Sequence, residues 1–131
     1  MSAPLSDLIV VELSGDVATR YCGKLFAEHG ARVVSAFVPR NDRLAYGGMS
    51  AAAYAAWLDA GKELPGVLPA DIAPDVVIAG QGHDDIARAQ AVVARFKRRP
   101  LLLALTWFGA VGPCATWQGS DGIIHAMSGI A

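Results

Sequence analysis

The sequence has few of the features that mark membrane, secreted or nucleic-acid-binding proteins. Residues 1–16 contain no basic stretch and no apolar run longer than the Leu-Ile-Val-Val of residues 8–11, so neither a signal peptide nor a membrane-spanning helix is predicted. A formal net charge of −1 gives no electrostatic reason to expect a nucleic acid or an anionic membrane as partner. We therefore expect a cytoplasmic protein.

Cysteine is also scarce, and the common nucleotide-binding motifs are missing. Cys22 and Cys114 are the only cysteines and lack the spacing of a metal site, so we predict two reduced thiols packed as small hydrophobes and no bound metal. Neither G-x-G-x-x-G nor G-x-x-x-x-G-K-[ST] occurs, so the usual dinucleotide and P-loop motifs are absent.

What the sequence does contain is a succession of strand and helix patterns. Hydrophobic residues make up 53% of the chain, enough for one packed domain over residues 1–131 with no internal boundary. Short β-branched runs predict parallel strands, and apolar residues at three- and four-residue spacing predict helices. The predicted strands are residues 8–14, 31–38, 74–80 and 100–106, and the clearest helices are residues 15–30 and 83–99. This alternation predicts an α/β fold, namely a Rossmann-like, mostly parallel open sheet with helices on both faces.

The helix predicted over residues 15–30 has an apolar side and a polar side. Val17, Tyr21 and Leu25 recur at four-residue spacing and are predicted to face the sheet. The same stripe can extend to Ala18, Cys22 and Phe26. The polar residues predicted to face solvent are Arg20, Lys24 and Glu28. Gly30 is predicted to end the helix, because glycine adopts the left-handed conformation there without strain.

Other stretches allow more than one interpretation. Residues 50–64 fit a weak helix or a helix that leads to a short strand, and the prolines in residues 65–74 exclude a long helix there. Four basic residues within 95–99 could form a phosphate patch, but we favour cations at the C-terminus of the 83–99 helix, opposing its dipole. His83 and the two aspartates after it could suggest a metal or a base; we favour helix capping by the acids.

Ligands of open parallel sheets bind beyond the carboxyl ends of the strands. In this sequence every loop at those ends contains glycine or aspartate. Glycine lets backbone N–H groups approach a phosphate or a thioester closely. The patterns alone therefore predict a ligand site at this edge and leave the ligand unidentified.

Several spaced motifs together indicate a resemblance to a known protein family. Pro-Leu and Val-Glu-Leu stand at residues 4–5 and 11–13, and Gly-Ala-x-Val at residues 30–33. F-G-x-x-G-P occupies residues 108–113, and D-x-x-x-x-A-x-S-G residues 121–129. In this order, over nearly the whole chain, the sequence resembles the family III CoA-transferases, or CaiB/BaiF family, which includes formyl-CoA transferase, carnitine CoA-transferase and α-methylacyl-CoA racemase.

The resemblance implies a part of a larger enzyme. Family members are much longer dimers that move CoA between a thioester and a carboxylic acid, with CoA as a substrate and no permanently bound cofactor. Their nucleophilic Asp follows the A-x-S-G element, so we expect it to lie beyond this chain and predict no catalytic residue within it. On this reading Asp121 only begins a helix, and Ser120 replaces the His of racemase relatives.

The resemblance also implies CoA-binding residues. Gly15, Val17 and Ala18 match family positions that line the pantetheine and adenine end, and Arg40 could replace a nearby family arginine. Other CoA contacts are lost, because residues 79–85 replace the usual Glu-Asn-Phe-Arg-Pro-Gly segment and only Gly61 and Lys62 remain of Asn-Arg-x-Lys-Arg. Losing charged donors should weaken binding of the CoA phosphates.

Two functions stay open at this point. The first is the N-terminal, CoA-binding part of a family III acyl-CoA transferase. The second is a degenerate, non-catalytic family III domain that serves as a binding or scaffold module. The lost CoA contacts favour the second, and the intact residues 108–113 and 126–129 favour the first.

Overall fold

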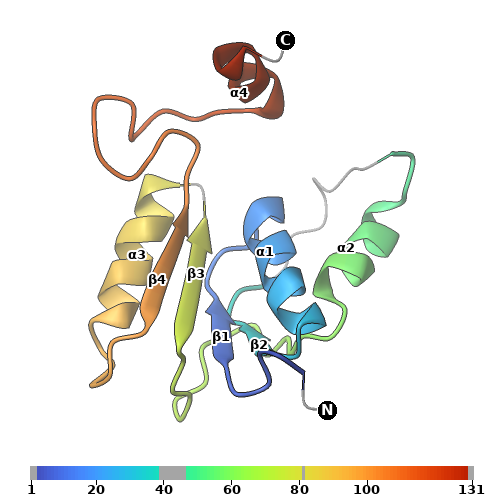
Figure 1. Cartoon of the computed structure of the whole chain (residues 1–131), viewed down its shortest axis with the longest axis vertical. Helices are drawn as coiled ribbons and strands as arrows, with labels where there is room; N and C mark the ends of the chain where they lie inside the picture. Colours follow the sequence, from blue (N-terminus) through green and yellow to red (C-terminus); the bar gives the residue numbers. More distant parts are fainter. Residues whose placement is uncertain (1–2, 39–46, 81, 130–131) are drawn as a thin grey trace.

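A computed structural model describes residues 3–38, 47–80 and 82–129 of the chain. Four parallel strands form one sheet in the order β2-β1-β3-β4, and helices lie against it (Figure 1). In chain order the elements are β1 (Ile9–Glu12), α1 (Val17–Glu28), β2 (Arg32–Ser35), α2 (Ala51–Asp59), β3 (Val76–Gly80), α3 (His83–Val93), β4 (Leu101–Leu105) and α4 (Asp121–Ser128). The predicted α/β fold with a parallel sheet is confirmed.

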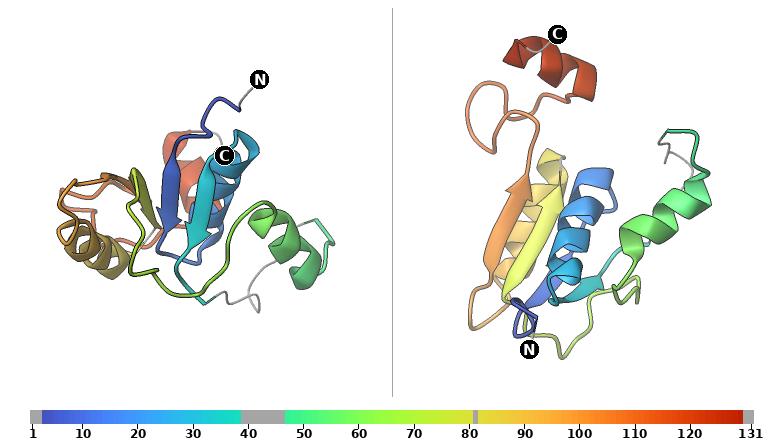
Figure 2. Two further views of the ribbon diagram at one scale, coloured as in Figure 1. Left: turned by 90° about the horizontal axis from the view of Figure 1, so that it is seen from below. Right: turned by 45° about the vertical axis from the view of Figure 1, so that its right-hand side comes forward.

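The two faces of the sheet carry separate apolar clusters, because alternate strand residues point to opposite sides. On one face Val10 and Ile78 pack with Cys22 and Phe26 of α1. On the other face Val11 and Val77 are buried, and Val93 at the end of α3 packs against their cluster. Helices on both faces of the sheet are therefore confirmed, and two views of the chain show α1 and α3 on its two sides (Figure 2).

The orientation of α1 differs from the prediction. Tyr21 is 45% exposed and Leu25 41% exposed, whereas Arg20 is completely buried and Lys24 is 5% exposed. The residues that face the sheet are Cys22 and Phe26, from the predicted edge of the stripe. The prediction was wrong because α2 covers the polar side of α1 and supplies partners for its cations.

Asp59, at the end of α2, is the partner of Arg20. Its two carboxylate oxygens accept hydrogen bonds from Nε and Nη2 of Arg20 at 3.0 and 2.6 Å. The ammonium of Lys24 lies 4.7 Å from the ring centroid of Trp57, also on α2, and 2.8 Å from Glu28. A paired cation can be buried where an unpaired one cannot, so helical periodicity alone placed these residues on the wrong side.

For residues 50–64 the sequence allowed a weak helix or a helix that leads to a short strand, and the structure agrees with the second alternative. After α2, the chain runs alongside β2, where Glu63 forms a parallel bridge with Val34. The backbone of Glu63 accepts from Ser35 N at 2.8 Å and donates to Val33 O at 2.9 Å. A helix leading to a short extended segment is therefore the correct description.

The helix predicted over residues 83–99 is shorter than expected. It ends at Val93, so the basic residues after position 94 do not belong to its last turn. Arg98 instead lies 3.3 Å from the carboxylate of Asp75. The acids of the first turn form no capping hydrogen bond, since Gly82 occupies the N-cap position.

Candidate functional site

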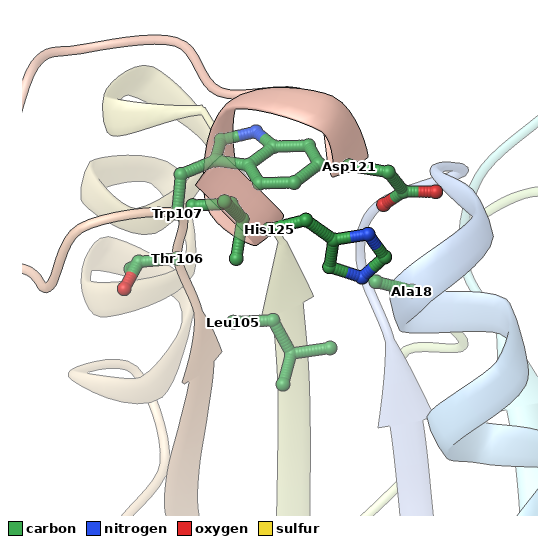
Figure 3. Close-up of a pocket in the computed structure, with 7 residues that line it drawn as sticks. Ala18, Leu105, Thr106, Trp107, Asp121 and His125 are labelled. Carbon is green, nitrogen blue, oxygen red and sulfur yellow. The ribbon is translucent and has the colours of Figure 1, made fainter. Parts of the chain in front are cut away.

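A pocket lies at the carboxyl edge of the sheet, beneath α4. It has a volume of about 360 Å³. Its floor comes from the end of β4, one side from the first turn of α1 and the roof from α4 (Figure 3). The residues that line it are Ala18, Leu105, Thr106, Trp107, Asp121, Ile124 and His125. The pocket therefore lies beyond the strand ends, at the edge of the sheet where the sequence predicted a ligand site.

The α1 side of the pocket is built by a tight turn after β1. Asp16 is the N-cap of α1, and its two carboxylate oxygens accept from the backbone N–H and the hydroxyl of Thr19 at 2.9 and 2.7 Å. A Cβ on Gly80 would lie 2.2 Å from each of these two side chains, so only glycine lets β3 end this close to α1. Because a carboxylate already caps α1, its N-terminus is less available to an anion than the sequence suggested.

The residues predicted to bind CoA are partly gathered here. Ala18 lines the pocket and Val17, exposed, precedes it on α1. Gly15 is not among the lining residues, and a Cβ there would lie 3.0 Å from the ring of Phe37. The space beside Gly15 is thus occupied by a side chain of the protein. Arg40 lies outside the described residues.

The α4 side of the pocket carries its polar groups. Asp121 starts α4, as the sequence predicted, and Ser120 is its N-cap. One turn later His125 projects from the same side, and both side chains point from α4 toward Ala18 (Figure 3). The sequence analysis missed His125 and Trp107, although their positions, four residues after Asp121 and directly after a predicted strand, were available signals.

A second polar cluster lies inside the protein, at the carboxyl end of β1. Nζ of Lys62 donates to Oε1 of Glu12 and to the backbone carbonyl of Arg20, each at 2.6 Å. The other oxygen of Glu12 accepts from the hydroxyl of Ser35. Within the described part of the chain, no buried side-chain nitrogen or oxygen lacks a hydrogen-bond partner. This cluster joins β1, β2, α1 and the segment after α2.

The charged side chains of this cluster, Lys62 and Glu12, are completely buried. Burial raises the pKa of Glu12 above its ordinary value of 4.5, although Lys62 and Ser35 act in the opposite direction. Burial and the nearby Glu12 also raise the pKa of the Cys22 thiol, which keeps it protonated and unreactive. The cluster therefore resembles a structural centre rather than a reactive one.

The described residues contain no group of three or more His, Cys, Asp or Glu side chains that could hold a metal ion. Among the same residues, no helix is long and apolar enough to cross a membrane.

The fold of the chain can be compared with those of known proteins. No family model matches the chain, and a search of curated proteins finds no match. A solved structure does match: a CaiB/BaiF family protein from Brucella suis, with a TM-score of 0.73, 23% identity and coverage of 99% of this chain. The chain has the fold of a CaiB/BaiF family protein. It spans only 40% of the length of that protein.

The CaiB/BaiF fold accounts for the whole described chain. Since the match covers 99% of the residues, the sheet, the helices on both faces and the terminal α4 are all included in the comparison. Two of the motifs that suggested this family from the sequence, residues 108–113 and 121–129, lie in the segment from β4 to α4, which supplies most of the residues that line the pocket.

Proposed function

We propose that this chain is the N-terminal, CoA-binding part of a family III acyl-CoA transferase, an enzyme that moves CoA between a thioester and a carboxylic acid. The shared CaiB/BaiF fold and the family motifs of the sequence support the proposal. The single observation that carries it is the pocket at the carboxyl edge of the sheet. Ala18, one of the residues that the resemblance assigns to CoA, forms one of its walls.

The walls of the pocket suit a flexible, mostly apolar arm. Ala18, Leu105, Ile124 and Trp107 supply apolar surface, whereas the hydroxyl group of Thr106 accepts a hydrogen bond from the backbone N–H of Gly109. A volume of about 360 Å³ accommodates part of a pantetheine chain and a short acyl group. In this proposal the chain binds and orients the thioester, and the nucleophilic Asp that the family resemblance implies lies beyond this chain.

The charges around the pocket predict weak affinity for the CoA phosphates. Lys62, which matches a cation of the family pattern, is buried on Glu12 and cannot reach a ligand. Arg20 is likewise engaged by Asp59. Asp16 adds a negative charge at the N-terminus of α1. We therefore expect dissociation constants in the millimolar range for this chain by itself, about −4 kcal/mol of binding free energy.

The internal pairing of Lys62 and Arg20 also favours a second candidate function. A scaffold module would keep the fold and lose the ligand, and the internal use of Lys62 and Arg20 is consistent with such a loss. A direct binding measurement separates the two functions.

The experiment is a calorimetric titration of CoA into three proteins. Ala18→Glu places a carboxylate in the pocket at the second residue of α1, and Ala52→Glu makes the same change at the second residue of α2, away from the pocket. Both substitutions put an acid in a first helical turn, where it is tolerated, and circular dichroism checks that all three proteins fold alike.

The enzyme proposal predicts that the wild type and Ala52→Glu bind CoA alike and that Ala18→Glu binds about tenfold more weakly or worse, because an anion then meets an anionic ligand at close range. Absence of binding to the wild type at millimolar CoA would support the scaffold function instead. Equal binding by all three proteins would place the CoA site elsewhere.

A further inference from the structure

Asp121 and His125 present unused polar groups to the pocket. Both belong to α4, one helical turn apart, and both line the cavity. Figure 3 shows the carboxylate and the imidazole pointing the same way, toward Ala18 and away from the Trp107 ring. Among residues 3–38, 47–80 and 82–129, neither side chain has a hydrogen-bond or ion-pair partner.

The chemistry of this pair limits which ligand group can satisfy it. An ionised carboxylate only accepts hydrogen bonds, and an imidazole offers at least one N–H donor. An anionic group would be repelled by Asp121, and a cation would be repelled by His125 when the ring is protonated. An apolar group that displaced water from the two side chains would leave both of them unpaired. A hydroxyl group satisfies both at once, since it can donate to the carboxylate and accept from the ring.

We propose that Asp121 and His125 together recognise a hydroxyl group on the ligand, held against the apolar wall formed by Ala18, Leu105 and Ile124. This inference rests on the proposed function, because it assumes that an acyl-CoA enters the pocket. The hydroxyl can belong to the acyl group or to the pantetheine arm of CoA, and these two sources make different predictions.

The test compares two thioesters that differ by one hydroxyl group, 3-hydroxybutyryl-CoA and butyryl-CoA, with CoA itself as the ligand without an acyl group. His125→Phe keeps a flat ring but removes the N–H, and His125→Gln restores a donor on a different skeleton. His125 is exposed and lies on a helix with no buried residue, so both variants should fold. Affinities are measured by calorimetry, and the His125 ring protons are followed by NMR.

If the acyl group carries the hydroxyl, the wild type binds 3-hydroxybutyryl-CoA about fivefold more tightly than butyryl-CoA, the ratio expected of one net hydrogen bond. His125→Phe abolishes that preference, and His125→Gln retains part of it. If the hydroxyl is that of the pantetheine arm, His125→Phe weakens all three ligands by the same factor and His125→Gln restores all three.

Equal affinities of all three proteins for all three ligands would overturn the proposal while leaving CoA binding intact. If no CoA ligand binds, the proposed function fails on its own, and free 3-hydroxybutyrate and butyrate then replace the thioesters in the NMR titration. Shifts of the His125 ring with 3-hydroxybutyrate alone would still support hydroxyl recognition, and no shift with either acid would overturn it.

Discussion

Nζ of Lys62 lies 2.6 Å from Oε1 of Glu12, and both side chains are completely buried. A buried ion pair of this kind is held in place by its hydrogen bonds more than by a net gain in stability, because desolvation of the two charges offsets their attraction. Here the pair connects β1 to the segment after α2, so we expect it to fix where that segment docks.

Removing one partner should therefore cost much more than removing both. Lys62→Met leaves the Glu12 carboxylate buried without its cation and should lower the free energy of unfolding by about 3–5 kcal/mol. Glu12→Leu combined with Lys62→Met should recover most of that loss. Urea denaturation measures all three proteins.

The matched control is the ion pair between Arg32 and Glu63, whose side chains are both 53% exposed. Arg32→Gln should change the stability far less than Lys62→Met does, since water screens this pair. A loss of equal size in both variants would mean that burial does not govern the Glu12 pair.

The pH dependence of stability should carry the signature of Glu12. Since burial raises the pKa of Glu12 above 4.5, the native state binds this proton more tightly than the unfolded state. Its contribution to stability is therefore complete below pH 4.5 and is lost as the pH rises through the native pKa. Relative to the Glu12→Leu/Lys62→Met protein, the wild type should lose stability from pH 4.5 upward, measured by urea denaturation at successive pH values. A wild type that gains stability relative to the Glu12→Leu/Lys62→Met protein as the pH rises above 4.5 would contradict this assignment.

Gly23 leaves room for the same carboxylate. A Cβ at this position would lie 1.7 Å from Oε1 of Glu12, which Lys62 and Ser35 hold in place. Gly23→Ala should therefore destabilise the protein by about 1–3 kcal/mol, even though alanine favours a helix. Gly122→Ala in α4, where nothing lies within 4 Å of an added Cβ, should cause no loss. Thermal unfolding compares the two variants, and equal melting temperatures would refute the close approach.

The charge of Asp16 should oppose anion binding. Asp16→Asn keeps a side-chain oxygen to accept from the N–H of Thr19 and removes the negative charge at the N-terminus of α1. We expect unchanged stability and an affinity for CoA that rises up to about fivefold, for about 1 kcal/mol of relieved repulsion. Calorimetry measures the affinity. A weaker affinity would show that Asp16 itself contacts the ligand.

The strand patterns were sufficient to predict the fold class, because each buried strand is a short apolar run bounded by glycine, proline or polar residues. The orientation of α1 was not predictable from periodicity alone. Arg20 is buried only because Asp59, 39 residues away, supplies its partner, and a local pattern contains no information about such a distant pairing. The early end of α3 was missed because basic residues are compatible both with a helix end and with the turn that follows.

The candidate site was predictable in its location but not in its composition. Parallel strands bring their carboxyl ends to one edge, so a ligand site was expected there, and Ala18 and the end of β4 both line the pocket. Gly15 was read as room for a ligand, whereas the ring of Phe37 fills that space. His125 enters the pocket only through the path of the chain between Thr106 and Ser120, which has no repeating pattern from which it could be inferred.

The most direct test of the account is an amide NMR titration of the chain with CoA. A CoA site at the carboxyl edge of the sheet predicts progressive shifts at Val17 and Ala18 and in residues 105–125 at millimolar CoA, with α3 unaffected. Shifts confined to α2 or α3, or no shift at any residue, would contradict a CoA site at the carboxyl edge of the sheet.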